Sequence, residues 1–347
     1  MHYRVLGRTG LRVSEIGLGG EWLNGLTAGE TRAVLDAALE NGINLMDIFM
    51  PQAPTREHIG EALKGRREKM ILQGHLCTVY EDGQYTRTRD MEKTCRSFQD
   101  LLDRLQTDYI DIGMIHYVDS QEDFDLVFGG PVMAYARELK EKGIIRHIGM
   151  SSHNPHMALQ AAHSGLVVDE ARQTLYSQCE ALGVAITVMK PLGAGTLLKE
   201  ESSPFGVAMT VPQCIQYCLD RNGVKSVLVG CHTPQEVLEA VRHQTLPEAE
   251  RNYSHIFAAG APLSMTGKCM YCNHCQPCPA HLDIAAITKF LDLARQQDQV
   301  PETVMEHYWS LEATAEDCLE CGRCEPNCPF GVQIRENMKQ ARELFRR

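Results

Sequence analysis

Long apolar runs and an excess of basic charge are both missing from this sequence, and each absence excludes a class of protein. No stretch of about 18 consecutive apolar residues occurs, so we expect no membrane-spanning helix. Lys and Arg total 34 against 45 Asp and Glu, and the net charge of −11 argues against binding to nucleic acid or to an anionic membrane. The opening residues Met1–Arg4 lead into no apolar secretion signal. We therefore expect a cytoplasmic protein that acts on a small-molecule substrate.

Cysteine, in contrast, is abundant, and eight of the 14 cysteines form two tight runs near the C-terminus. The second run reads C-x2-C-x2-C-x3-C-P, which is the spacing that bacterial ferredoxins use for [4Fe–4S] clusters. The first run has one residue fewer before its last cysteine and is also followed by proline. The two runs are Cys269, Cys272, Cys275 and Cys278, and Cys318, Cys321, Cys324 and Cys328.

A cubane cluster needs four thiolates, of which a C-x2-C-x2-C loop supplies three and a more distant cysteine the fourth. In ferredoxins with two clusters the fourth cysteine of each run serves the other cluster, so we expect Cys278 and Cys328 to be exchanged. Zinc sites usually use two separated cysteine pairs, and disulfides do not suit a cytosolic chain. The spacing therefore predicts two [4Fe–4S] clusters in a small α-helical, ferredoxin-like domain over residues 261–347.

Residues 1–260 alternate short apolar runs with amphipathic helical stretches, a pattern that indicates parallel βαβ units. Such a series in a chain of this size predicts an α/β fold of the TIM (β/α)8 barrel type. The expected strands are Glu15–Gly20, Asn44–Phe49, Met70–Leu76, Tyr109–Tyr117, Ile144–Ser152, Val184–Pro191 and Val224–Cys231.

One segment is too short for this pattern. Leu166–Val168 begins like a sixth strand, yet Asp169–Leu182 already has the pattern of the next helix. A strand of about five residues and its loop are expected between them. We favour the interpretation that the printed sequence omits a segment, because a barrel that lacks a strand has two unpaired edges. The alternative is a short, distorted strand with a very tight loop.

Several segments resemble the aldo/keto reductase family, and the last of them resembles the branch that carries a C-terminal iron–sulfur domain. The resemblance extends over nearly the whole chain and implies a (β/α)8 barrel. The segments are Tyr3–Ser14, Asn44–Asp47, Ile59–Leu63, Asp108–Asp111 with His116, Gly143–Ser152, and Met189–Gly195.

The resemblance also implies a catalytic set of Asp, Tyr, Lys and His, of which this chain keeps two members. Asp47 and His116 match, whereas Gln52 stands at the Tyr position and His75 at the Lys position. A glutamine cannot donate a proton as a phenol does. We therefore do not expect the ordinary Tyr-based reduction of carbonyl groups. Tyr80 would replace the phenol only if the loop after His75 folds inward.

The family resemblance implies NAD(P) as a cofactor, but the residues leave its use open and do not separate NAD from NADP. Met189 stands where the family often stacks a Tyr on the nicotinamide. The turn that begins at Gly230 precedes a predicted helix, whose first N–H groups could bind a phosphate. No Lys or Arg lies from Gly230 to Val241 to hold the 2′-phosphate of NADP.

Catalytic groups of such barrels lie at the C-terminal ends of the strands. Asp47, His75 and His116 end consecutive strands, and two roles fit them. In the preferred role, Asp47 orients an imidazole that acts as general acid and base. In the other, the three form a two-His, one-carboxylate metal site. Further residues expected to contact substrate or cofactor are Glu21, Trp22, Gln52, Tyr117, His153, Lys190 and Gly230.

Two of the remaining strand-end residues have competing roles. We expect Lys190 to bind an anionic group rather than to form a Schiff base. We expect Cys77, two residues after His75, to be a structural thiol.

The leading hypothesis is an iron–sulfur oxidoreductase. Its clusters would pass single electrons between a ferredoxin or flavoprotein partner and a small organic substrate in the barrel. A second hypothesis is a non-redox lyase or isomerase that uses histidine acid/base chemistry and has structural clusters. A third is an electron-transfer or regulatory protein with an inactive barrel.

Overall fold

The computed structural model describes most of the chain. The chain forms two compact units. The first unit is Met1–Val79 with Arg87–Pro262, and the second is Tyr80–Thr86 with Leu263–Arg347. The sequence placed residues 80–86 in the first domain, whereas they pack with the second unit. The described residues are 1–81, 83–154, 157–158, 160–161, 172–203, 205–258, 267–269, 271, 274–295, 300 and 302–346.

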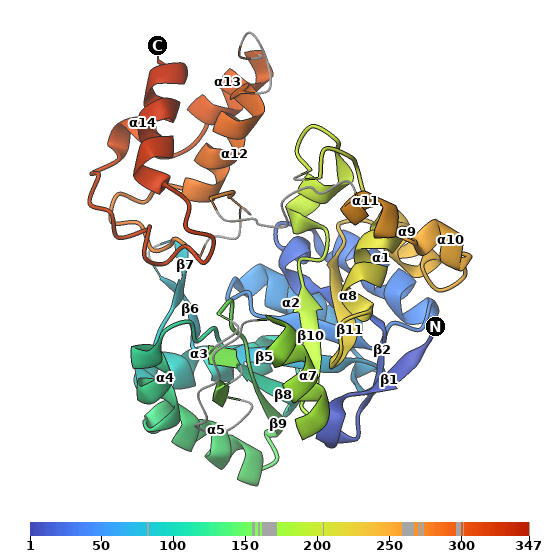
Figure 1. Cartoon of the computed structure of the whole chain (residues 1–347). Coiled ribbons are helices and arrows are strands. Elements are labelled where there is room, and N and C mark those ends of the chain that lie inside the picture. Colours follow the sequence, from blue (N-terminus) through green and yellow to red (C-terminus); the bar gives the residue numbers. More distant parts are fainter. Residues whose placement is uncertain are drawn as a thin grey trace. The chain divides into compact units, whose positions relative to one another are not determined.

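A parallel sheet of seven strands forms the centre of the first unit, in the order β10-β11-β3-β4-β5-β8-β9 (Figure 1). The strands follow one another in space as they do in sequence, and β11 pairs with β3. This is the circular order of a TIM barrel, interrupted between β9 and β10 among the described residues. The strands are β3 Ile16–Gly19, β4 Leu45–Ile48, β5 Ile71–Leu76, β8 Ile110–Ile115, β9 Ile145–Met150, β10 Ile186–Met189 and β11 Val224–Gly230.

The structure confirms all seven expected strands. Every residue of β3 and β4 is buried, as parallel strands covered by helices require, whereas β10 and most of β9 are only partly buried. The expected sixth strand near Leu166–Val168 and the proposed omission there lie outside the described residues. They stay predictions.

Helices follow the strands and cover the sheet (Figure 1). Their starts have recognisable local causes: Thr27 and Glu30 form a capping box at the start of α1, and Thr233 caps α9. The helices are α1 Ala28–Glu40, α2 Ala53–Leu63, α3 Met91–Arg104, α4 Gln121–Phe128, α5 Pro131–Glu141, α7 Arg172–Leu182, α8 Val211–Leu219, α9 Pro234–Arg242, α10 Glu248–Arg251 and α11 Ser254–Ala258. None of the described helices is long and apolar enough to cross a membrane.

Two short hairpins complete the strands. β1 Tyr3–Val5 pairs with β2 Arg12–Ser14 ahead of the barrel strands. β6 Thr78–Glu81 and β7 Gln84–Arg87 form a second two-stranded sheet directly after β5.

The second unit is helical and contains α12 Ile284–Arg295, α13 Glu302–Trp309 and α14 Ile334–Leu344. The helices enclose a small core in which the rings of Tyr308 and Phe345 stack 4.1 Å apart. Both α12 and α14 begin six residues after the last cysteine of a run, at Cys278 and Cys328 respectively. The two cysteine loops and their helices thus form an internal repeat.

Candidate functional site

The predicted convergence of Asp47, His75 and His116 is confirmed in the first unit. The Nε2 atom of His75 lies 3.0 Å from Oδ1 of Asp47, and its Nδ1 atom lies 2.8 Å from Nδ1 of His116. All three side chains are buried. The geometry follows from the sheet, because β4, β5 and β8 are neighbours in parallel register and the three residues lie at the same edge.

Three further residues, which the sequence did not single out, hold this set in place. Gln73 donates a hydrogen bond from Nε2 to Oδ1 of Asp47 at 3.0 Å. Phe49 stacks on the His116 ring with centroids 5.4 Å apart, and Arg89 donates to the His116 carbonyl at 3.0 Å. Gln73 lies two residues before His75 in β5, so the two side chains face the same side of the strand. This spacing can be read from the sequence.

Both roles considered for this set stay predictions, and its hydrogen bonds show which atoms meet. The Nε2 atom of His75 faces the carboxyl group of Asp47, where a ring N–H donates to the carboxyl oxygen. The Nδ1 atom of His75 faces Nδ1 of His116, and the tautomers decide which of the two rings donates this hydrogen bond. Both nitrogens of His75 are therefore engaged in hydrogen bonds in this structure. Among the described residues, no three His, Cys, Asp or Glu side chains form a site for a single metal ion.

The replaced family positions differ in their surroundings. His75 is the centre of the hydrogen-bonded set, whereas Gln52 precedes α2 and its Oε1 atom is buried with no hydrogen-bond partner among the described residues. A buried acceptor without a partner is costly, so a bound molecule that donates a hydrogen bond to Gln52 would be stabilised. Tyr80 is exposed, and a phenol supplied by this residue stays a prediction.

Tyr117 and His153 extend the set along the ends of the strands. The ring of Tyr117 lies 4.9 Å from that of His116 and 5.5 Å from that of His153. His153 Nδ1 is 2.8 Å from Oδ2 of Asp119. Burial alone would raise the pKa of Asp119, but hydrogen bonds from His153 and Ser152 hold it below its ordinary value. Burial raises the pKa of Tyr117, so its phenol is neutral at physiological pH.

Lys190 and Glu21 are brought together as an ion pair, with Nζ and Oε2 3.2 Å apart. Lys190 ends β10 with a left-handed backbone (φ 54°), which is uncommon for a residue other than glycine. Glu21 compensates the charge of Lys190 in this structure, and anion binding by Lys190 stays a prediction. Cys77 also has a positive φ of 70°, and burial raises the pKa of its thiol, in agreement with a structural role.

The turn after β11 is partly filled by side chains of this protein. The backbone N–H of His232 already donates to Oε2 of Glu236 at 2.6 Å, so an anion would meet a carboxylate. Trp22 covers the other side: a Cβ atom at Gly230 would lie 1.9 Å from its indole, and its ring contacts that of His232 edge-on. The sequence predicted that Gly230 and Trp22 contact a cofactor or substrate. In the structure the two residues contact each other, and their contact with a cofactor or substrate stays a prediction.

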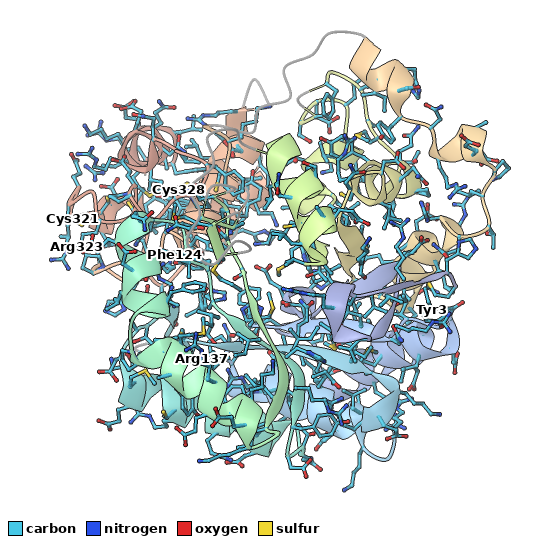
Figure 2. The ribbon with its side chains drawn as sticks, turned by 60° about the horizontal axis from the view of Figure 1, so that its bottom comes forward. Tyr3, Phe124, Arg137, Cys321, Arg323 and Cys328 are labelled. Carbon is cyan, nitrogen blue, oxygen red and sulfur yellow. The ribbon has the colours of Figure 1, made fainter. Side chains whose placement is uncertain are left out.

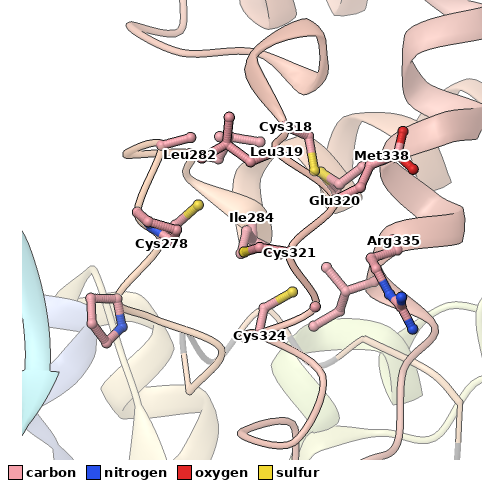
Figure 3. A pocket seen from close by; sticks show the side chains of 15 residues that line it. Cys278, Leu282, Ile284, Cys318, Leu319, Glu320, Cys321, Cys324, Arg335 and Met338 are labelled. Carbon is pink, nitrogen blue, oxygen red and sulfur yellow. The ribbon is translucent and has the colours of Figure 1, made fainter.

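In the second unit the cysteines gather around two pockets, and each pocket draws on both runs. Figure 3 shows the side chains of Cys278, Cys318, Cys321 and Cys324 around the first pocket. The second pocket is lined by Cys269, Cys275 and Cys328. The exchange of Cys278 and Cys328 that the spacing predicts is therefore present in the arrangement. Cys272 lies outside the described residues.

The chemistry of these pockets suits a cation. No disulfide joins the described cysteines. Burial, together with the neighbouring Glu325, Cys278 and Cys318, raises the pKa of Cys324 to about 11. Clustered thiols resist ionisation unless positive charge is bound, and metal binding supplies that charge and releases the protons. Cys321 is exposed and lies beside Arg323 (Figure 2), whereas Cys275 of the other pocket is buried.

Residues 15–214 match the model of the aldo/keto reductase family, and the chain belongs to this family. It is 32% identical over 161 residues to the uncharacterized oxidoreductase YqkF of Bacillus subtilis, which covers 45% of this chain and 51% of that relative. It is 31% identical over 161 residues to the aldo-keto reductase YhdN of the same organism, with 44% and 47% covered. The chain thus spans about half the length of these curated relatives.

Among solved structures, the chain is similar to the holo form of the aldo-keto reductase AKR11C1 from Bacillus halodurans. The TM-score is 0.64 at 26% identity, and the match covers 76% of this chain and 97% of that chain. This similarity agrees with the TIM-barrel-like fold of the first unit.

Proposed function

We propose that this protein is an iron–sulfur oxidoreductase that exchanges electrons with a small organic substrate at the barrel mouth. The observation that carries the proposal is that each pocket combines cysteines of both runs: four cysteines line the first pocket, and three described cysteines line the second. Family membership and the oxidoreductase names of the relatives support the reaction class.

The first proposed cluster site consists of Cys278 with Cys318, Cys321 and Cys324. The second consists of Cys269, Cys275 and Cys328, together with Cys272, which belongs to it by its place in the C-x2-C-x2-C run. A bound [4Fe–4S] cluster supplies one-electron transfer at a potential set by its hydrogen bonds, charge and exposure. Among the cysteines described, the exposed Cys321 marks the first site as the one open to a ferredoxin or flavoprotein partner.

In the barrel, the proposed role of His116 is to exchange a proton with the substrate through Nε2. A proton taken up at Nε2 lets His116 pass its Nδ1 proton to Nδ1 of His75, 2.8 Å away. The imidazolium that results on His75 faces the carboxylate of Asp47, which stabilises it. In the reductive direction the same steps run in reverse. A substrate that receives two electrons also needs two protons, and His116 delivers one of them.

The electron source proposed is a protein partner rather than a nicotinamide. The family implies NAD(P), and a phosphate at the turn after β11 would have to displace Glu236 from the N–H of His232. No step proposed here requires the nucleotide. The free thiols agree with a reducing compartment, and we place the protein in the cytoplasm on that ground.

A second candidate function is a non-redox lyase or isomerase that uses the same three residues. It is favoured by one observation: the hydrogen-bonded set from Asp47 to His116 is complete without any cofactor. In that case the clusters would only stabilise the second unit.

Anaerobic purification with iron and sulfide analysis tests the first proposal. We expect about eight irons per chain, bleaching on addition of dithionite, and re-oxidation by the true substrate. About four irons, or zinc in their place, would contradict the two-cluster assignment. Eight irons without any substrate-dependent re-oxidation would favour the lyase or isomerase.

A further inference from the structure

The tip of the β6–β7 hairpin belongs to the unit that carries the cysteines. Residues Tyr80–Thr86 lie in sequence between two barrel strands, yet they pack with Leu263–Arg347. The side chain of Gln84 contributes hydrogen bonds of well-defined geometry to this contact.

The amide of Gln84 holds the backbone of Cys278. Its Oε1 atom accepts a hydrogen bond from the N–H of Cys278 at 3.1 Å. Its Nε2 atom donates to Nδ1 of His281 at 2.9 Å and, more weakly, to the carbonyl of Cys278 at 3.4 Å. An amide has two donor hydrogens and can serve both acceptors. His281 itself has a left-handed backbone (φ 55°) and therefore needs such support.

Cys278 is the ligand of the first proposed site whose position its own loop does not determine. Cys318, Cys321 and Cys324 come from one C-x2-C-x2-C turn, whereas Cys278 reaches the same pocket from the other run. Its N–H also donates to Gln276, two residues earlier, at 2.8 Å. Gln276 belongs to the same loop as Cys278. Gln84 lies 194 residues away in the sequence, so its hydrogen bond connects Cys278 to a separate segment.

We propose that Gln84 is a positioning residue for Cys278 and sets the properties of the cluster at the first site. This inference rests on the proposed clusters. Hydrogen bonds and charge around a ligating cysteine tune the reduction potential of its cluster. Loss of Gln84 releases the backbone of Cys278 and changes the cluster at this site, while the cluster at the site of Cys328 keeps its properties.

The experiment is an anaerobic redox titration of the full chain, followed by electron paramagnetic resonance. Gln84→Ala is expected to shift the midpoint potential and the spectrum of one cluster and to leave the other unchanged. Gln84→Glu keeps the acceptor for the Cys278 N–H, loses both donors and adds negative charge. It should move the same cluster to a lower potential.

Two further variants separate the loss of the Gln84 hydrogen bonds from the general effects of substituting a glutamine. Gln121→Ala removes an exposed helical glutamine that bonds Asp125 in the first unit, and it should shift neither cluster. Gln276→Ala removes the local bond to the same N–H and should alter the same cluster as Gln84→Ala. If Gln84→Ala does not load iron, Gln84→Glu supplies the measurement.

The possible failures can be told apart. A wild-type protein without iron–sulfur clusters would overturn the proposed function. A wild-type protein with about eight irons, whose two potentials and spectra are unchanged by Gln84→Ala and Gln84→Glu, would overturn this inference alone.

Discussion

The two units place their chemical groups by opposite means. In the barrel, Asp47, His75 and His116 come from three rigid strands and bond directly to one another. In the second unit the described cysteines of the two runs come from loops and surround two pockets. The barrel set is therefore organised before anything binds. The cysteine sets depend on what they bind, so substitutions in the two units should fail in different ways.

The largest effect is expected from Cys278→Ser. It removes the fourth thiolate from the set of Cys318, Cys321 and Cys324, so about four irons per chain should be lost together with electron transfer. Iron analysis and electron paramagnetic resonance should show that Cys278→Ser and Cys318→Ser damage the same cluster. Cys95→Ser, outside both runs, is the control and should retain full loading. If Cys278→Ser instead damaged the cluster that Cys269→Ser damages, the exchange would be wrong.

In the barrel, His75→Ala should lower turnover by roughly 10²–10⁴ while iron content and cluster spectra stay unchanged. The substitution removes the group that receives the proton from His116 and faces Asp47. Steady-state kinetics on the true substrate measure the effect, and His58→Ala in α2 is the matched histidine control. Gln52→Tyr combined with His75→Lys restores the family's residues and should not improve the native reaction. Full activity of His75→Ala would contradict the proposed acid/base role of His75 and its partners.

A smaller effect is expected from Gln73→Leu, which removes the hydrogen bond to Asp47 without removing the carboxylate. A hydrogen bond to a charged group contributes about 1.5–3 kcal/mol, so kcat should fall roughly 10- to 100-fold. Because Asp47 acts through His75, the double variant Gln73→Leu with His75→Ala should be no slower than His75→Ala alone. If the losses of kcat in the two single variants added in the double variant, Gln73 would act on a group other than the Asp47–His75 pair.

The smallest effect concerns stability at acid pH. Burial lowers the pKa of His243 from 6.5 to about 4, and its Nε2 atom bonds Gln216 at 2.9 Å. The folded state therefore favours the neutral ring. This contribution is fully present above pH 6.5 and is lost as the pH falls toward 4, by roughly 2 kcal/mol between pH 7.5 and 5. His243→Gln should flatten that dependence, measured by unfolding of the first unit. An unchanged slope would contradict it.

The strands and the convergence of Asp47, His75 and His116 could be predicted because both follow from local pattern and parallel order. The cysteine exchange followed from spacing alone. Gln73, Glu236 and Gln84 were not found, since each is an ordinary polar residue whose role depends on the neighbour that the fold brings to it. The same holds for Lys190: its position at a strand end was readable, but Glu21 as its partner was not.

The proposed exchange of the fourth cysteines also makes assembly of the two cluster sites depend on both cysteine runs. Because each run lends its last cysteine to the other pocket, neither half of the repeat can complete a site by itself. During synthesis the first run, ending at Cys278, must wait until Cys328 has been made. Assembly of this unit is therefore expected to be all-or-none and late, and a chain cut between the two runs would have no complete site.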